Sequence, residues 1–480
     1  MTLEQRQRSR RPTDIGVEGP TPRDMLRAFT SVRADPLGFL AAQQRRYGDL
    51  VAFPVPGPPV LLLNDPVDVR QVLQAGARHW NKETVQYAAL ARVTGPGLLA
   101  SADASWMNHR RISAPAFHHQ RLDGLADQVR AATHRPLADW DRLPPQGAVI
   151  DVADVVLKVA LDIVGRTLFS ADLSSRAQDL LKATSEAAQL IVALGRSIVP
   201  VPDWVPTRTN LRLRSASRQL DALCHDLIDR RRSVSTSTYG TPRTRDTSAT
   251  TGSHDTPGTH GDDLLGLLVD GGLSDREIRD ELVTMVVAGH ETVAAALSWT
   301  LMLLAEDQPA QDRLRAEVRS TDRPVTMTDA AAQLPWTRAV VDEALRLYPP
   351  AWVVSRRSSA PDVIGGRDVP AGTTAIISPW LLHRRAESFP HPLSFRPERF
   401  LLGAGTRARS DYVPFGLGPR LCIGREFALS EMTIVLSQLL ARHRVDTPAG
   451  WSRPTPEALV AVHPRGGMPL SVTPCGDDRR

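Results

Sequence analysis

A chain of 480 residues, 42% of them hydrophobic, is long enough to build a large core, and its three cysteines exclude a disulfide framework. Its net charge is +5, but only three of the 58 basic residues are lysines, and the arginines are spread along the chain among 53 acidic residues. This distribution excludes the clustered basic face of a nucleic-acid-binding protein. No stretch resembles a signal-peptide core or approaches the roughly 18 apolar residues of a membrane span, so we expect a cytoplasmic protein.

The first half of the chain predicts a flexible lead, a small sheet and then helices. Residues 1–23 begin with an arginine-rich stretch and contain no apolar run, so we expect them to be flexible. Leu50–Phe53 and Val60–Leu63 have the composition of two strands joined by a Pro/Gly turn. Helical spacing of apolar residues then follows over residues 151–168, 174–193 and 210–232.

Trp106 and Arg110 stand four residues apart, so on a helix they share one face and could bracket one ligand. The same two residues also fit an ordinary packed pair, in which the arginine stem covers the ring. The spacing alone leaves both interpretations open.

Residues 233–261 form a segment of biased composition, because 20 of these 29 residues are Ser, Thr, Gly or Pro. Such a segment cannot bury enough apolar surface to order itself. The helical patterns on both sides belong together, so we expect a disordered surface insertion within one domain that spans residues 1–480.

Ser274-Asp275-Arg276-Glu277 has the form of a capping box and starts a helix predicted to run to about Leu304. Within this helix lies the segment Ala288-Gly289-His290-Glu291-Thr292. Glycine is a poor helix former there, and the threonine hydroxyl can bond the carbonyl of Ala288. Taken alone, the pattern fits a mildly bent core helix.

A later helix, which begins at Pro335, carries Glu343 and Arg346 one turn apart. On an exposed helix such a pair is worth about 0.2–0.5 kcal/mol, whereas a buried pair needs further partners to offset desolvation. The pattern after this helix predicts a strand at 351–354, small antiparallel strands over 362–378, and a hairpin over 460–472 that turns at Gly466-Gly467.

One cysteine lies in a glycine-rich loop, Pro414-Phe415-Gly416-Leu417-Gly418-Pro419-Arg420-Leu421-Cys422-Ile423-Gly424. The glycines permit close approach to the backbone. A helical pattern from Phe427 places Cys422 just before a helix N-terminus, which favours a thiolate. A buried structural cysteine is the plain alternative. A thiolate in an apolar loop is also how proteins give haem iron a strongly electron-donating axial ligand.

The spacing of the fixed positions in this loop, F-x-x-G-x-R-x-C-x-G, resembles the cytochrome P450 family. The segments A-G-x-[DE]-T at 288–292, E-x-x-R at 343–346 and P-E-R-F at 397–400 resemble that family in the same order. The resemblance implies a single-domain, mainly α fold with small β-sheets. In it, haem b lies between the long distal helix and the proximal Cys422 loop, Cys422 is the iron ligand, and O2 is the co-substrate.

The resemblance also implies roles for individual residues. Thr292 and Glu291 would act in catalysis, as carriers of the protons that O2 activation needs. A structural triad that supports the haem loop would consist of Glu343, Arg346 and Arg399. The implied cofactor-binding residues are Cys422, Phe415, Gly416, Arg420, Gly424, Trp106, Arg110, Ala288, Gly289 and Arg356, with Arg357 left open as the alternative to Arg356.

The implied activity is monooxygenation, by hydroxylation or epoxidation, of a hydrophobic terpenoid, lipid or polyketide-like compound in secondary metabolism. Because no G-x-G-x-x-G fingerprint or flavin module is visible, electrons would come from a separate ferredoxin or flavodoxin with its NAD(P)H-dependent reductase. We expect a monomer. Two other classes stay open: a peroxide-using or rearranging haem-thiolate enzyme, and a non-catalytic haem-binding sensor. The Glu291-Thr292 pair argues against both.

Overall fold

The computed structural model describes residues 15–101, 103–173, 177–195, 204–238, 260–401 and 411–475. Most of this part of the chain is helical, which confirms the predicted fold class. The helices are α2 (Pro22–Ala34), α3 (Pro36–Tyr47), α4 (Pro66–Arg70), α5 (Val85–Thr94), α6 (Asp103–Ser113), α7 (His119–Leu122), α8 (Ala126–Asp141), α9 (Val152–Phe169), α10 (Ala177–Gly195), α11 (Arg208–Thr238), α12 (Leu264–Asp270), α13 (Asp275–Glu306), α14 (Gln308–Arg319), α15 (Ala330–Gln333), α16 (Pro335–Leu347), α17 (Pro379–Leu382) and α18 (Arg425–Arg442).

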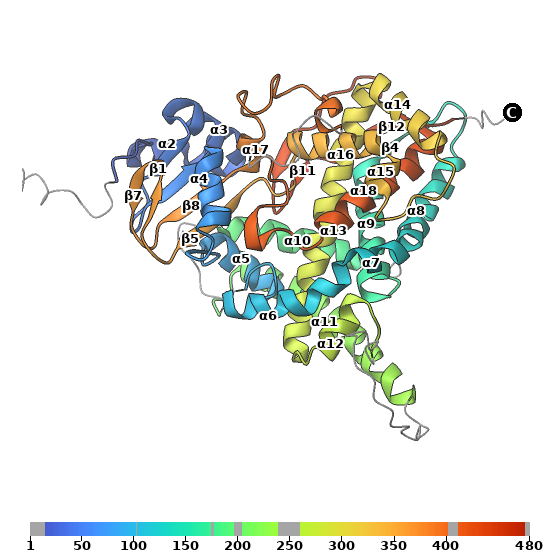
Figure 1. The fold of residues 1–480 in the computed structure, drawn as a ribbon, viewed down its shortest axis with the longest axis horizontal. Helices are drawn as coiled ribbons and strands as arrows, with labels where there is room; N and C mark the ends of the chain where they lie inside the picture. The colour runs from blue at the N-terminus through green and yellow to red at the C-terminus, as the bar shows by residue number, and fades with distance from the viewer. Residues whose placement is uncertain are drawn as a thin grey trace, which may run out of the picture.

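Short strands form four small sheets beside the helices. The strands are β1 (Leu50–Phe53), β2 (Val60–Leu63), β3 (Trp80–Asn81), β4 (Ala148–Asp151), β5 (Val354–Ser358), β6 (Asp362–Ile364), β7 (Arg367–Val369), β8 (Thr374–Ile377), β9 (His443–Asp446), β10 (Pro456–Ala458), β11 (Val462–Pro464) and β12 (Pro469–Pro474). The sheet orders are β1-β2-β8-β5-β3, β4-β12-β9, β10-β11 and β6-β7. The five-stranded sheet, with α2 and α3, lies to one side of the helical part (Figure 1).

The predicted pair of N-terminal strands is present, with Leu50 opposite Leu63 and Phe53 opposite Val60. Strand β2 also pairs in parallel with β8, whose Thr374 lies opposite Val60. The leucines of β2 are buried between the two clusters on the faces of the sheet. The sheet therefore joins the N-terminal segment to residues more than halfway along the chain.

Helix α13 runs through the centre of the helical part (Figure 1). Its capping box is formed as predicted: the Ser274 hydroxyl accepts the Glu277 N–H, and the Glu277 carboxylate accepts the Ser274 N–H at 2.9 Å. Among the described residues, α13 is the one helix long and apolar enough to cross a membrane, but 83% of that apolar window is buried inside the protein. It is therefore placed as a core helix, packed against α9, α11 and α16.

The predicted hairpin over residues 460–472 is wrong. Gly466 and Gly467 do turn the chain, with φ of 81° and 92°. However, β11 pairs with β10, whereas β12 pairs with β4 and β9. A Cβ on Gly467 would lie 2.3 Å from an oxygen of Asp151, and the Met468 N–H donates to the Asp151 carboxylate at 2.8 Å. These contacts direct the chain after the turn toward β4.

Other boundaries differ slightly from the predicted ones. The strand predicted at 351–354 begins at Val354, and α11 continues to Thr238, inside the predicted insertion. Most of that insertion, residues 239–259, and most of the predicted N-terminal lead, residues 1–14, lie outside the described residues. The extent of the domain and the nature of these two segments stay predictions.

A fully buried ion pair ties α16 to the irregular segment that follows α17. Glu343 and Arg346 are both 0% exposed, and Arg346 Nε and Nη2 each donate to the Glu343 carboxylate at 2.8 Å. Arg399 Nε adds a third contact to Glu343 at 3.2 Å. Arg346 also donates to the carbonyls of His383, Pro392 and Ser394. Both charges are therefore paired and hydrogen-bonded, which buried charges require.

We predict that Arg346→Ala lowers the free energy of unfolding by about 3–5 kcal/mol, because it leaves the Glu343 carboxylate buried without its main partner. Urea-induced unfolding measures the change. Arg323→Ala is the matched control, since Arg323 is 72% exposed and meets Asp329 at 3.5 Å. An exposed pair of that kind is worth at most about 1 kcal/mol. Equal costs for the two substitutions would contradict the structural role of the Arg346 network.

Candidate functional site

The cysteine loop is shaped by its own backbone hydrogen bonds. The Cys422 N–H donates to the Phe415 carbonyl at 3.0 Å, and the Gly416 N–H donates to the Val413 carbonyl at 3.0 Å. Gly418 has φ of 73°, and a Cβ there would lie 2.0 Å from the carbonyl oxygen of Leu73. Only glycine fits at this close approach. Helix α18 begins at Arg425, so Cys422 lies just before its N-terminus.

Hydrogen bonds connect this loop to the buried network of Arg346. Arg346 holds the carbonyl of His383, and the His383 ring accepts the Val413 N–H at 2.9 Å. The Tyr412 hydroxyl donates to the carbonyl of Asp342 on α16 at 2.9 Å. The loop before Cys422 is thus anchored on the same helix as the ion pair.

Cys422 is exposed, although the surrounding protein raises the pKa of its thiol by desolvation. The Gly424 N–H and the cations Arg110 and Lys82 act in the opposite direction, toward the thiolate. The sulfur is therefore desolvated yet reachable. A thiol that coordinates a metal is deprotonated outright, so this environment fits a metal ligand.

The other two cysteines fit that role less well. Burial raises the pKa of Cys224 to about 12. Cys475, directly after β12, accepts a hydrogen bond from Arg315 at 2.6 Å. Within the described ranges, no group of three or more His, Cys, Asp or Glu could hold a bare metal ion.

Helix α13 is the predicted distal wall of the site. This helix is buried almost continuously from Ile278 to Ala305, and the central residues that remain accessible are Ala288, Gly289 and Thr292, which share one face. Thr292 Oγ1 donates to the Ala288 carbonyl at 2.7 Å, as the sequence predicts. Ile423, beside Cys422, packs against the cluster that includes Val286 and Val287 of α13. Small residues on one wall and an accessible sulfur on the other fit a flat ligand between them.

Cationic side chains converge near Cys422. Arg110 Nη1 donates to the Leu421 carbonyl at 2.9 Å, and Arg420 lies over the Trp106 ring at 4.1 Å. Trp106 and Arg110 thus bracket the residues directly before Cys422. Arg356 is buried and bonds the Tyr87 hydroxyl at 3.2 Å, whereas its neighbour Arg357 on β5 is exposed. The alternation of the strand therefore selects Arg356 as the inward-facing arginine.

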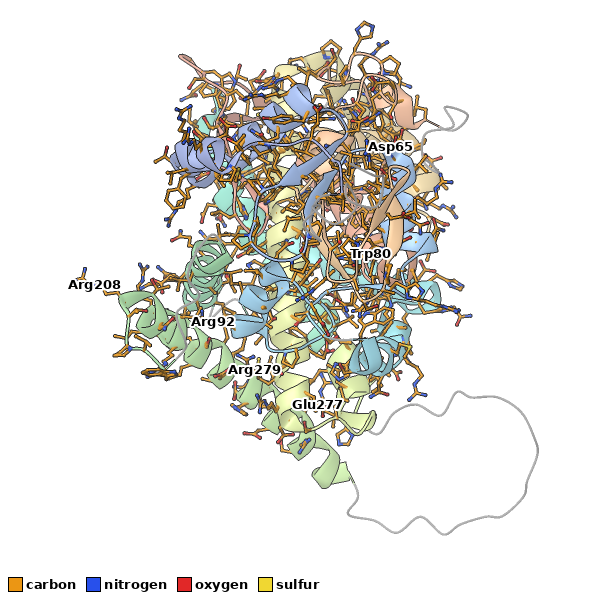
Figure 2. All side chains as sticks on the ribbon, turned by 90° about the vertical axis from the view of Figure 1, so that its left-hand side faces the viewer. Asp65, Trp80, Arg92, Arg208, Glu277 and Arg279 are labelled. Atoms are coloured by element: carbon orange, nitrogen blue, oxygen red, sulfur yellow. The ribbon has the colours of Figure 1, made fainter. Side chains whose placement is uncertain are left out.

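Lys82 joins these arginines, and the sequence reading missed it. Its Nζ donates to the Leu99 carbonyl at 2.8 Å and lies 4.8 Å from the centre of the Tyr87 ring. Burial lowers the pKa of Lys82 well below its ordinary value, and Arg356 and Arg420 lower it further. Trp80, two residues earlier, lies on β3 of the five-stranded sheet and is labelled in Figure 2. Converging cations of this kind fit the two carboxylates of a haem.

Glu291 lies one residue before Thr292 and is buried among apolar groups. Its Oε2 atom has no hydrogen-bond partner within the described chain, and desolvation raises its pKa to about 8. The carboxyl is therefore protonated at neutral pH and can donate a proton. His290 faces elsewhere: its Nδ1 contacts the Val286 carbonyl, and burial lowers its pKa to about 4.

Comparisons with known proteins agree with this geometry. The family model for Cytochrome P450 matches residues 18–470. Cyclooctatin synthase from Streptomyces melanosporofaciens is 32% identical over 90% of this chain and 91% of that protein. Cyclooctat-9-en-7-ol 5-monooxygenase from the same organism is 31% identical over 85% of each. The crystal structure of CYP175A1 from Thermus thermophilus has a TM-score of 0.74 and 30% identity over 96% of this chain and 100% of that one. The chain therefore belongs to the cytochrome P450 family of haem-thiolate enzymes.

Proposed function

We propose that this P450 is a cytoplasmic, monomeric monooxygenase that inserts one oxygen atom of O2 into a C–H or C=C bond of a hydrophobic small molecule. Electrons come from a separate ferredoxin or flavodoxin with its NAD(P)H-dependent reductase. The observation that carries the proposal is the pairing of an accessible Cys422 on one wall with the accessible Ala288, Gly289 and Thr292 on the other. When bound between these walls, haem supplies the O2 chemistry.

In this proposal each group of residues has one task. Cys422 ligates the iron, and Phe415, Gly416 and Gly424 surround it on the proximal side. Lys82, Arg110, Arg356 and Arg420, with Trp106, hold the propionates. On the distal side, the Thr292 hydroxyl holds a water, and the neutral Glu291 carboxyl supplies protons to it.

The side chains available for a substrate are apolar. Trp352, Val353 and Val354 are half-buried ahead of and at the start of β5, and Val460 packs against the cluster that contains Val286 and Val287. The cations, by contrast, gather beside Cys422 and Tyr87. One relative is named for an alcohol with a single C=C bond, cyclooctat-9-en-7-ol. These observations favour a weakly polar, terpenoid-like substrate, in secondary metabolism, over a charged one.

A peroxide-using or rearranging enzyme is the alternative within the family. Such chemistry does not require two protons to be delivered to bound oxygen. The raised pKa of Glu291, one residue before the accessible Thr292, favours the monooxygenase, because it supplies a carboxyl that can hold a proton on the distal helix. A sensor has no need of this arrangement either.

Cys422→Ser should abolish the thiolate-type Soret band of the reduced carbon-monoxide complex, because an alcohol cannot replace a thiolate as the iron ligand. Cys224→Ser and Cys475→Ser serve as controls and should keep the band. Absorption spectra of freshly reduced protein measure this. A thiolate band that survives in Cys422→Ser would assign the ligand to another residue.

Thr292→Ala should keep haem binding and substrate affinity but lower the product formed per reductant consumed, with hydrogen peroxide released instead. The substitution removes the hydroxyl proposed to control proton delivery, together with the γ-methyl group. Thr300→Ala is the matched control, since Thr300 makes the same 2.7 Å bond to the carbonyl four residues back but is buried. Product, peroxide and reductant are measured together with one saturating substrate. Unchanged coupling in Thr292→Ala would support the peroxide-using or rearranging alternative.

Glu291→Gln should remove part of the pH dependence of stability. The unfolded chain releases the Glu291 proton near pH 4.5, whereas the folded chain keeps it to about pH 8, so stability falls as the pH rises between these values. Glutamine does not titrate. The midpoint of thermal unfolding of Glu291→Gln, relative to the wild type, should therefore rise over this range. A constant difference between Glu291→Gln and the wild type would mean that Glu291 ionises normally.

A further inference from the structure

We propose that His109 and Glu281 form a buried clamp that positions the cofactor-binding helix α6 against the distal helix α13, so that haem is held more tightly while His109 is protonated. In this role His109 is a positioning residue, because it touches neither the cofactor nor the substrate. The inference rests on the proposed placement of haem between α13 and the Cys422 loop.

The contact itself is short and buried. His109 Nδ1 lies 2.6 Å from Glu281 Oε1, with the two residues 4% and 0% exposed. Glu277, one turn earlier on α13, lies 3.8 Å from the other ring nitrogen. Figure 2 labels Glu277 near the lower end of this helix. A charge-assisted hydrogen bond in a desolvated place is strong, so the pair fixes how α6 meets α13.

Helix α6 carries the cofactor contacts on either side of His109. Trp106 stacks on Arg420, and Arg110, the next residue after His109, bonds the Leu421 carbonyl beside Cys422. The helix therefore touches the proximal loop through Arg110 and the distal helix through His109. If the His109 contact loosens, Arg110 and Trp106 shift with the same rigid turn of helix, and the propionate edge of the site opens.

The charge on His109 is set by α13. The hydrogen bond with Glu281 is the largest cause that raises the pKa of His109, and the charges of Glu281 and Glu277 raise it further against desolvation. Helix α12 and the turn at 114–117 also pack against α6. Of these, α12 carries one charged residue, Asp270, which is bonded to His260, and the turn carries none. The pKa of His109 is therefore set by the two carboxylates of α13, Glu277 and Glu281.

The pH dependence follows from the sign of this shift. The pKa of His109 in the folded protein lies above its unfolded value of about 6.5. The stabilisation by the His109–Glu281 contact is therefore complete below pH 6.5. It is lost as the pH rises through the folded pKa of His109. Above it, the imidazole is neutral and its charge-assisted contact with Glu281 is lost, while the buried Oε2 atom of Glu281 has no hydrogen-bond partner in the described chain. The contact between His109 and Glu281 therefore weakens at alkaline pH.

The test is the rate of haem transfer from the holoenzyme to excess apomyoglobin, measured from about pH 6 to about pH 9. The wild-type rate should rise with pH. His109→Gln and Glu281→Gln should both release haem about tenfold faster than the wild type at the acid end, where the clamp is intact, and should show a flatter profile. The double variant, an uncharged pair, should also be flat and should release haem more slowly than either single variant, because no charge is left buried alone.

His443→Gln is the matched control. His443 is a buried histidine that meets a carboxylate, Asp141, at 3.2 Å, but it lies on β9 and not on α6. It should keep the wild-type pH profile. The clamp alone would be overturned by one pair of results. The single variants would release haem at the wild-type rate and with the wild-type pH profile, and their reduced carbon-monoxide complexes would still show the thiolate band. A thiolate band that persists in Cys422→Ser would instead overturn the haem placement on which the clamp rests.

Discussion

The buried guanidinium of Arg346 is the constraint on which the rest of the site depends. The segment from His383 to Arg399 contains no strand and little helix, so its carbonyl groups need donors from elsewhere. Arg346 supplies donors in a fixed planar arrangement and holds three of these carbonyls while pairing with Glu343. From His383 the connection continues through Val413 to the loop that carries Cys422. A buried ion pair that is costly to desolvate thus anchors, through hydrogen bonds, a loop that has almost no regular structure.

The charged and the apolar side chains of the site are separated. Cations from four different parts of the chain, Lys82, Arg110, Arg356 and Arg420, gather near Cys422, and apolar side chains pack against Val286 and Val287 of α13. Like charges brought together and desolvated are unfavourable until anions join them. A flat group with carboxylates on one edge would therefore favour the orientation that brings those carboxylates to the cations. In the proposed placement of haem, these cations are the groups that would orient it.

Residues that belong to a spaced pattern could be predicted from the sequence, and isolated residues could not. The sequence assigned Glu343, Arg346 and Arg399 to one cluster, and the structure brings these three side chains together. Lys82 and the His109–Glu281 contact stand in no such pattern, because their importance arises when distant segments meet. The rarity of lysine, with three among 58 basic residues, was the one feature of the composition that singled out Lys82. The Gly466-Gly467 turn shows a different limit: glycines reveal that a chain turns, not which strand it will join.

The strand pairings also set an order of events while the protein is being made. Val60 pairs with Thr374, and Ala148 pairs with Val472, so two N-terminal strands leave the ribosome long before their partners exist. Until then β2 presents an unpaired edge, which is a feature that chaperones protect from aggregation. Of the groups proposed to hold the cofactor, Lys82 is made early, whereas Arg420 and Cys422 are made near the end. Capture of haem is therefore a late step of biosynthesis, and the supply of cofactor must match the release of nearly complete chains.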